Sequence, residues 1–435
     1  MKFLFSFRFI FLVSFFLSAC LPNGVQIPQS PALRFLERKS GLIAYVGNDG
    51  NIHLIDQSGA SAAQLTTDVT PENRNSVLYR LPAWSRDSNQ LAFMRHEREG
   101  ESLISEIFVA NTTDEITKKI LSGSDFTIYL NWSPDNQNIG LLTSAASGQS
   151  IVLQNLSIDG AQRTIVDAGN PFYWSWAPDG KTMLVHKNGG NPNAPQQIAF
   201  LKNNADEVLE FVLEERPASF QAPAWSPSGE YILISTVSED NKKQLVLTDS
   251  TGANPKTISE IPLNTLFAWA PDSEQFAYII GKDSQLQGGA IGELHVADVF
   301  GSEEIVIDEN VFGFFWSPDS SQLAYFIPFV STPENEDGTT TGQQQTLYFS
   351  LNVLDIASGE SKEIAVYQPT EEFFSIMPFI DQYHQSITIW SPDSNNLVIS
   401  FLTQEGIPAI AIVPASGITQ PRLLAEGSFA VWSWK

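Results

Sequence analysis

The sequence predicts an all-β fold, an eight-bladed β-propeller of four-stranded antiparallel blades, from three observations. A W-S-P-D phrase recurs along the chain with its main tryptophans mostly 44 to 49 residues apart, a period typical of propeller blades. The strand after each phrase is apolar on both faces, as expected for a strand covered on both sides by neighbouring blades. Seven such strands each follow a phrase tryptophan, and one more, near residue 41, precedes the first phrase.

The phrase can be followed in order through the chain. It appears in full or nearly so at Trp84-Ser85, Trp132-Ser133-Pro134-Asp135, Trp176-Ala177-Pro178-Asp179, Trp225-Ser226-Pro227, Trp269-Ala270-Pro271-Asp272, Trp316-Ser317-Pro318-Asp319 and Trp390-Ser391-Pro392-Asp393. An incomplete copy ends the chain at 429–435, and its matching tryptophan is taken to be Trp434. One interval, from Trp316 to Trp390, is longer than the rest and predicts insertions within one unit.

Each unit contains two strand pairs. In residues 314–326, FFW predicts a strand, Ser-Pro-Asp-Ser a turn, and QLAYF a second strand. Proline presets φ at the second turn position, and Asp or Ser accepts nearby backbone N–H groups, so Asp319 and its equivalents are interpreted as turn-stabilising residues and not as catalytic acids. A second strand pair with a D-x-x-G-like turn follows, as in LNVLDIASG at 351–359.

This repeat resembles that of the TolB-like, WD40-like (PD40-type) β-propellers of bacterial envelope proteins, over about residues 41–435. The resemblance implies the propeller fold and an envelope location. It implies no particular function, because such repeats serve binding, scaffolding and accessory roles. We expect no counterpart of the α/β domain that precedes the propeller in TolB, so the role of TolB in the Tol system is not carried over.

The two ends of the repeat region predict how the ring closes. GLIAYVGNDG near residue 41 matches the second strand of a blade, and the segments at 51–56 and 63–66 match the third and fourth. SFAVWSW at 428–434 matches a first strand with no partner following it. We therefore expect the C-terminal strand to pair with the N-terminal strands and complete the eighth blade, which removes open sheet edges.

Residues 1–19 are predicted to be a signal peptide, because Lys2 and Arg8 precede a short apolar run. The segment ends in Leu-Ser-Ala-Cys, which resembles the lipobox of bacterial lipoproteins, so Cys20 is the predicted lipid attachment site. Residues 20–40 are then a lipidated, flexible tether, and the propeller spans 41–435. The alternatives are a plain export signal or an uncleaved anchor. Cys20 is the only cysteine, so no intramolecular disulfide can form.

The net charge of −25 disfavours nucleic acid and anionic lipid as partners. We expect membrane attachment through the N-terminal lipid only, a monomer, and an envelope protein or a glycan as partner.

Variable loops of a rigid scaffold are the usual home of binding residues. Strand parity places the loops at 95–102, 187–197, 281–292, 331–345 and 368–386 on one side of the ring. The last of these is the richest in aromatic residues, and its predicted partner contacts are Phe373, Phe374, Met377, Phe379, Tyr383 and His384. The alternative is that these side chains fold back and plug the ring.

No catalytic motif is found. The five histidines, at 53, 96, 186, 295 and 384, have no metal-ligand spacing, and there is no G-x-S-x-G, P-loop or dinucleotide fingerprint. We therefore expect a non-catalytic binding protein without cofactor or metal. The alternatives are a polysaccharide lyase or hydrolase with its site in the central cleft, and a passive envelope assembly scaffold.

Overall fold

The computed structural model describes residues 40–144, 148, 150–189, 195–203, 207–218, 220–282, 289–300, 302–331 and 345–435. The predicted signal peptide, Cys20 and nearly all of the tether lie outside these ranges, as do most of the loop at 331–345 and parts of those at 187–197 and 281–292. Within the described ranges, none of the helices has the length and apolarity needed to cross a membrane.

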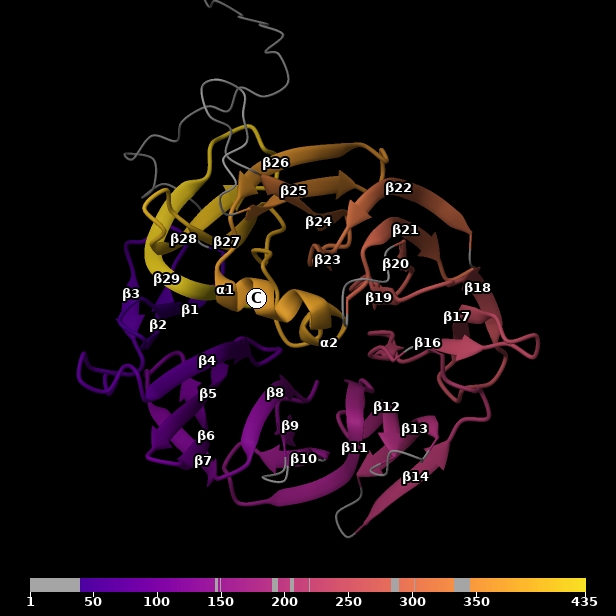
Figure 1. Cartoon of the computed structure of the whole chain (residues 1–435), viewed down its shortest axis with the longest axis horizontal. Coiled ribbons are helices and arrows are strands. Elements are labelled where there is room, and N and C mark those ends of the chain that lie inside the picture. The colour runs from indigo at the N-terminus through magenta and orange to yellow at the C-terminus, as the bar shows by residue number, and fades with distance from the viewer. Residues whose placement is uncertain are drawn as a thin grey trace, which may run out of the picture.

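The described chain forms six antiparallel sheets arranged around a common centre (Figure 1). Four of them have four strands each, in sequence order. They are β4 (Val77–Trp84), β5 (Gln90–Glu99), β6 (Ser102–Asn111) and β7 (Thr117–Gly123); β15 (Ala224–Trp225), β16 (Tyr231–Val237), β17 (Lys243–Asp249) and β18 (Lys256–Glu260); β19 (Thr265–Trp269), β20 (Gln275–Gly281), β21 (Gly292–Asp298) and β22 (Glu303–Val311); and β23 (Gly313–Trp316), β24 (Gln322–Ser331), β25 (Thr346–Asp355) and β26 (Ser361–Tyr367).

The other two sheets are larger because one long strand in each belongs to two strand sets. The seven-stranded sheet contains β8 (Phe126–Trp132), β9 (Asn138–Ser144), β10 (Ile151–Ser157), β11 (Arg163–Trp176), β12 (Thr182–Gly189), β13 (Gln196–Asn203) and β14 (Val208–Val212). The six-stranded sheet contains β27 (Asn396–Leu402), β28 (Pro408–Pro414), β29 (Arg422–Trp432), β1 (Ile43–Gly47), β2 (Ile52–Ile55) and β3 (Ala62–Gln64). The first half of β29 pairs with β28 and its second half with β1, which brings the two ends of the described chain into one sheet.

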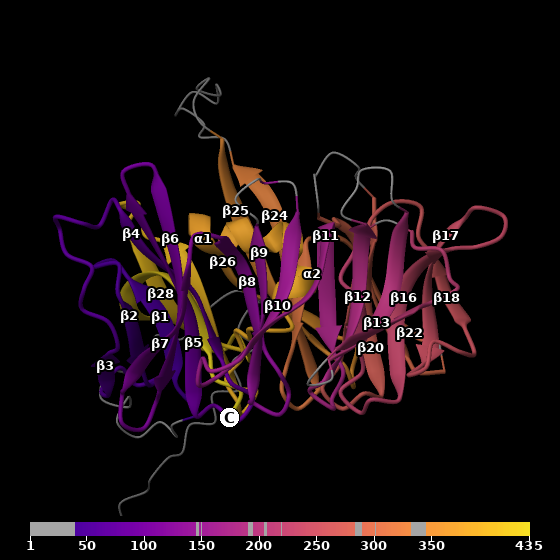
Figure 2. The ribbon, with the colours of Figure 1, turned by 90° about the horizontal axis from the view of Figure 1, so that it is seen from below.

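The structure confirms an all-β fold of propeller type built from the predicted strand pairs. The second strand of each set is buried on both faces, as in β24, where Leu323 to Phe326 are all buried. We define the turn side of the ring as the side that carries the W-S-P-D turns and the loop side as the opposite one. Figure 2 shows the β24–β25 hairpin rising on the loop side and the C-terminus on the turn side.

The W-S-P-D turns are held by the contacts predicted from their sequence. In the turn after β23, Ser317 Oγ donates to Asp319 Oδ1 at 2.7 Å and accepts from the backbone N–H of Gln322 at 2.9 Å. Asp319 also accepts from the backbone N–H of Ser321. These hydrogen bonds hold the pKa of Asp319 below its usual range, against the effect of burial. The role of this carboxylate is therefore to stabilise the turn.

Adjacent turns are also linked to one another. The fourth turn residue adopts a positive φ, and its side chain accepts a backbone N–H from the turn of the preceding sheet or strand set. These links are Arg86 to Asn136, Ser228 to Ser273, Asp272 to Ser320, Asp319 to Ser394 and Lys435 to Ser88. Glycine occupies the corresponding position at 180 and 229, where no side chain is available to make the link.

The phrase tryptophans form a second set of links between neighbouring sheets. In five of them the indole Nε1–H donates to the carbonyl just before the preceding phrase tryptophan, as in Trp132 to Ala83 and Trp390 to Phe315, both at 2.9 Å. The Nε1–H groups of Trp176 and Trp225 are buried without such a partner. The same rule relates Trp84 to Val431, the residue before Trp432. Trp432 also takes the phrase position in register, opposite Ile43. The match to Trp434 is therefore wrong by two residues, because the period alone could not separate two tryptophans in one short segment.

This correction predicts unequal effects for two substitutions. Trp432 is fully buried and its Nε1–H donates to the Ser40 carbonyl at 2.7 Å. Trp432→Phe should lower the free energy of unfolding by about 1–3 kcal/mol, because that carbonyl loses its donor and the side chain loses volume. Trp434→Phe should cost less, because Trp434 is half-buried. Urea unfolding of the two variants gives the comparison, and an equal or larger cost at Trp434 would contradict the new assignment.

Candidate functional site

Residues 368–386, predicted to be a loop, fold into helices at the centre of the ring. They are α1 (Glu371–Ile376), the 3₁₀ turn η2 (Met377–Phe379) and α2 (Ile380–Tyr383). Thr370 caps α1 by accepting the backbone N–H of Phe373. Figure 1 shows the helices lying across the middle of the ring. We call residues 370–388 the plug.

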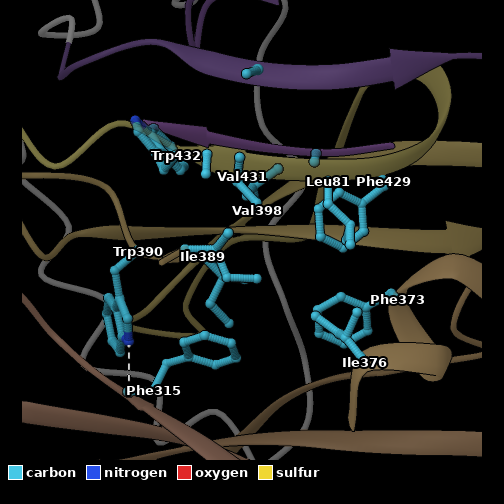
Figure 3. Close-up of a cluster of buried hydrophobic side chains, with 14 of the residues drawn as sticks. Leu81, Phe315, Phe373, Ile376, Ile389, Trp390, Val398, Phe429, Val431 and Trp432 are labelled. Carbon is cyan, nitrogen blue, oxygen red and sulfur yellow. Dashed lines mark hydrogen bonds between the residues drawn. The ribbon is translucent and has the colours of Figure 1, made fainter. Parts of the chain in front are cut away.

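Two of the predicted partner contacts lie in the interior. Phe373 is 2% exposed and Met377 is 1% exposed. Phe373 packs edge-on against Phe326 and Phe349, with ring centroids 5.7 and 6.5 Å away. Figure 3 shows Phe373 and Ile376 on the same side of the cluster as Phe429 of β29 and Leu81 of β4. Both side chains thus belong to the core, and in this arrangement neither can touch a partner directly.

The other four predicted contacts differ in exposure. Phe374, Tyr383 and His384 are half-buried. The Tyr383 hydroxyl donates to the Ile128 carbonyl at 3.2 Å, and its ring meets that of Tyr129 edge-on. The His384 Nδ1 lies 2.8 Å from the Ile380 carbonyl. Only Phe379 is exposed, with 41% of its surface accessible. The segment therefore plugs the ring, the alternative left open by the sequence, and a surface contact remains possible for Phe379.

Polar residues of the plug, which the repeat pattern did not single out, fasten it to several strands. The Gln382 side chain accepts from the Trp174 backbone N–H at 2.9 Å and donates to the Trp174 carbonyl at 2.8 Å. The backbone carbonyl of Gln382 accepts a hydrogen bond from the Tyr129 hydroxyl at 2.8 Å. At the other end, Glu372 forms an ion pair with Arg80 at 3.7 Å and accepts from the Ser428 hydroxyl. No repeat pattern could reveal these residues, because they lie in an insertion that occurs once.

Asp381 is a buried carboxyl in the plug. It accepts the backbone N–H of Ala222 at 2.7 Å and that of Gln382 at 3.0 Å. Burial raises its pKa to about 6, and these hydrogen bonds oppose the shift only in part. The carboxyl fastens the plug to the segment before β15.

Because the pKa of Asp381 is raised, we predict that replacing this residue increases the free energy of unfolding by an amount that depends on pH. The folded state binds this proton more tightly than the unfolded state, so stability falls as pH rises from about 3.8 to about 6 and stays lower above it. Asp381→Asn removes this effect and should raise the free energy of unfolding by about 2 kcal/mol at pH 8, with no gain at pH 3.5. Urea unfolding at the two pH values measures this. A loss of stability at pH 8 would mean that the charged form is the better partner of the Ala222 amide.

A cavity of about 520 Å³ lies beside the plug on the turn side of the ring. Tryptophans and prolines of successive W-S-P-D turns form its wall, and Pro178, Pro227 and Pro271 at its rim are exposed. The plug supplies His384, Gln385, Ile387 and Thr388. The sequence analysis placed function on the loop side and did not predict this cavity, although the turns that build it were identified.

Among the described residues, the cavity lining contains two ionisable side chains, Arg86 and His384. Arg86 donates to the Gln385 carbonyl, and its guanidinium carbon lies 4.3 Å from the ring centre of Trp434. Burial lowers the pKa of Arg86 to about 10 and that of His384 to about 4, so at neutral pH the arginine is charged and the histidine is neutral. The described lining therefore presents one cation and one neutral imidazole.

The histidines do not assemble into a metal site within the described ranges, where no group of three or more His, Cys, Asp and Glu residues could hold an ion. His96 and His186 are buried at the loop-side ends of β5 and β12, stacked or tilted against Phe126 and Phe220 with centroids 4.4 and 4.7 Å apart. Their aromatic contacts mark them as packing residues.

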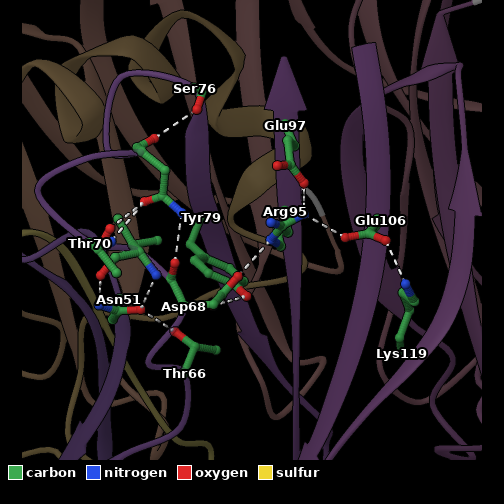
Figure 4. A network of polar contacts seen from close by, with 12 residues as sticks. Asn51, Thr66, Asp68, Thr70, Ser76, Tyr79, Arg95, Glu97, Glu106 and Lys119 are labelled. Carbon is green, nitrogen blue, oxygen red and sulfur yellow. Dashed lines mark hydrogen bonds and ion pairs between the residues drawn. The ribbon is translucent and has the colours of Figure 1, made fainter. Parts of the chain in front are cut away.

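The predicted loop at 95–102 is instead the end of a long hairpin, since β5 continues to Glu99 and β6 begins at Ser102. An ionic network joins these strands to neighbouring segments, with Arg95 and Glu106 largely buried and Asp68 and Lys119 about half exposed. Arg95 contacts Asp68 at 3.0 Å and Glu97 and Glu106 at 2.7 Å, and Glu106 also contacts Lys119 at 2.7 Å (Figure 4). The loop prediction was wrong because charged residues, which favour loops in a sequence pattern, are here paired across strands.

The loop side carries exposed apolar side chains. They are Leu78 at the start of β4, Phe329 and Val330 near the end of β24, Phe379 in η2, and Ile407 between β27 and β28. Phe329 is 41% exposed and stacks on Tyr348 of β25 with centroids 5.7 Å apart. These side chains lie on the side of the ring where the sequence predicted recognition.

Comparison with solved structures identifies chains of the same fold. An oligogalacturonate lyase in complex with manganese aligns over 87% of this chain and 97% of that chain, with 11% identity and a TM-score of 0.50. A eukaryotic initiation factor aligns over 90% and 98%, with 13% identity and a TM-score of 0.51. TolB from Acinetobacter baumannii aligns over 79% and 81%, with 12% identity and a TM-score of 0.37. At such identities the likeness concerns the fold alone.

Among curated proteins, Elongator complex protein 1 of Schizosaccharomyces pombe is 26% identical over 168 residues. The match covers 38% of this chain and 13% of that protein, so the chain corresponds to a small part of that relative's length. A scan against models of protein families finds no match. Together with the sheet arrangement, the likeness to the oligogalacturonate lyase and the initiation factor supports an all-β fold of propeller type.

Proposed function

We propose that this protein is a non-catalytic, lipid-anchored β-propeller that binds an envelope protein or glycan outside the cytoplasm. The observation that carries the proposal is the pair of exposed aromatic side chains on the loop side, Phe329 and Phe379, among the variable loops where the sequence predicted recognition. Exposed aromatic residues on a rigid frame are typical anchors of protein contacts.

The proposed ring has eight blades. The two larger sheets divide into two blades each at β11 and β29, and the other four sheets are one blade each. In the blade of β27 the first strand is reduced to a bridge between Trp390 and Leu397. The pairing of β1 with β29 supports closure of the ring by the C-terminal strand, and the N-terminal signal with Cys20 supports export and anchoring.

The partner surface is tested by capture from an envelope extract with the full chain. Deleting the plug would remove Phe373 and Met377 and uncover core side chains that they pack against, such as Phe326 and Phe349, so point substitutions are the sharper tool. We expect the double variant Phe329→Ser with Phe379→Ser to lose a partner that the unchanged chain captures.

Phe300→Ser is the matched control, because Phe300 is 76% exposed in the turn between β21 and β22, on the opposite side of the ring. It should retain the partner. Equal capture by all three proteins would place the partner surface elsewhere, and turnover of an envelope glycan by the purified chain would favour the enzymatic alternative.

A further inference from the structure

The cavity on the turn side holds a cation without an anionic partner. Among the described residues no carboxylate pairs with Arg86, although the chain has 49 acidic and only 24 basic residues. Its guanidinium donates to one backbone carbonyl, that of Gln385, and rests on the ring of Trp434. A guanidinium has five N–H donors in a planar fork that matches a carboxylate, so most of its capacity is unused by the protein contacts described.

We propose that this cavity binds a small organic anion, a monocarboxylate with an apolar body, and that Arg86 holds its carboxylate. This inference goes beyond the partner surface on the loop side and does not depend on it.

The walls determine the character of the ligand body. Trp225 and Trp434 are half-buried and reach the cavity, and Phe315, Ile387 and prolines of the turns surround it. Such a wall favours aromatic or aliphatic groups. Apolar side chains form the larger part of this wall, so a sugar would have to place many of its hydroxyls against surface that cannot replace their water. The volume of about 520 Å³ lies within the range of small-molecule sites, roughly 300–1,000 Å³.

Charge restricts the ligand further. The net charge of −25 repels polyanions at long range, and salt screens much of that repulsion for a single charge. Inside the cavity the local interaction with Arg86 dominates, because it is a charge-assisted hydrogen bond at short range and no acid lies in the described lining. A monoanion therefore fits the site better than an acidic polymer.

The test compares each carboxylate with its own uncharged amide. Isothermal titration of the full chain with 2-naphthoate and 2-naphthamide, and with decanoate and decanamide, measures the anion preference without any substitution. We expect at least one carboxylate to bind about ten- to a hundredfold more tightly than its amide, the range for a hydrogen bond to a charged group. Arg86→Gln should abolish the preference, and Arg86→Lys should retain part of it.

Two outcomes overturn the proposal. Equal affinity of acid and amide would show an apolar cavity that does not select anions. No binding of either pair at millimolar concentration would show that the cavity is not a ligand site. Should Arg86→Gln fail to fold, the acid–amide comparison on the unchanged chain still decides. Ligand binding that survives the Phe329→Ser and Phe379→Ser substitutions would separate this site from the partner surface.

Discussion

Replacing Phe373 by alanine is expected to lower the free energy of unfolding by about 3–5 kcal/mol, the usual cost of removing a buried phenylalanine from a core. Phe373 is 2% exposed and packs between the rings of Phe326 and Phe349. The plug is surrounded by strands from several sheets, so the cavity left by the substitution cannot collapse easily. Urea unfolding followed by tryptophan fluorescence measures the change.

Phe379→Ala is the matched control, because it removes the same side chain from the same short segment at an exposed position. We expect a change within about 0.5 kcal/mol. Similar losses for the two variants would contradict the burial difference on which the plug assignment rests. A small loss for Phe373→Ala together with lost partner capture would instead restore Phe373 as a contact residue.

Acidification from pH 7 to pH 4 is expected to lower the free energy of unfolding by about 6–7 kcal/mol. Burial lowers the pKa of His96, of His186 and of His384 to about 4. The unfolded state binds these protons more tightly, so the stability they contribute is present above about pH 6.5 and is lost as pH falls towards 4. Each shift corresponds to roughly 3 kcal/mol. Protonation of Asp381 has the opposite effect and raises the free energy of unfolding by about 2–3 kcal/mol over the same pH range.

His96→Phe should separate the contribution of one histidine. Both ring nitrogens of His96 are buried without a hydrogen-bond partner, and the ring stacks on Phe126. Phenylalanine keeps the stack and removes the unpaired polar atoms, so stability at pH 7 should rise by about 1–3 kcal/mol. The loss between pH 7 and pH 4 should shrink by roughly 3 kcal/mol.

His96→Gln is the control for titration alone. It also removes the ionisable ring, and should reduce the acid sensitivity by a similar amount, but it loses the aromatic contact and should not gain stability at pH 7. Chemical unfolding at half-unit pH steps measures both the stability at pH 7 and the loss of stability between pH 7 and pH 4. An unchanged acid slope in both variants would show that His96 is not the group that becomes protonated.

The sequence alone predicted the all-β fold, the strand pairs and the roles of the repeated residues. It could do so because short segments of each repeat determine its structure. A proline and a Ser–Asp pair specify the turn, and a strand that is apolar on both faces must be packed against other strands on both sides. Asp319 illustrates this, since the contacts predicted for it are the ones the structure contains. The period could not decide between Trp432 and Trp434, because only register distinguishes them.

Tertiary structure decided everything that repetition does not encode. Residues 368–386 have a composition that fits either an exposed aromatic loop or a buried plug, and the choice depends on whether a central space exists to receive them. The ring provides that space, and burial of Phe373, Met377 and Ile380 offsets the conformational entropy lost on ordering the segment. Arg86 shows the same dependence. In the sequence it is a variant residue in one turn, and only closure of the turns around a common cavity places its guanidinium in a lining with no carboxylate among the described residues.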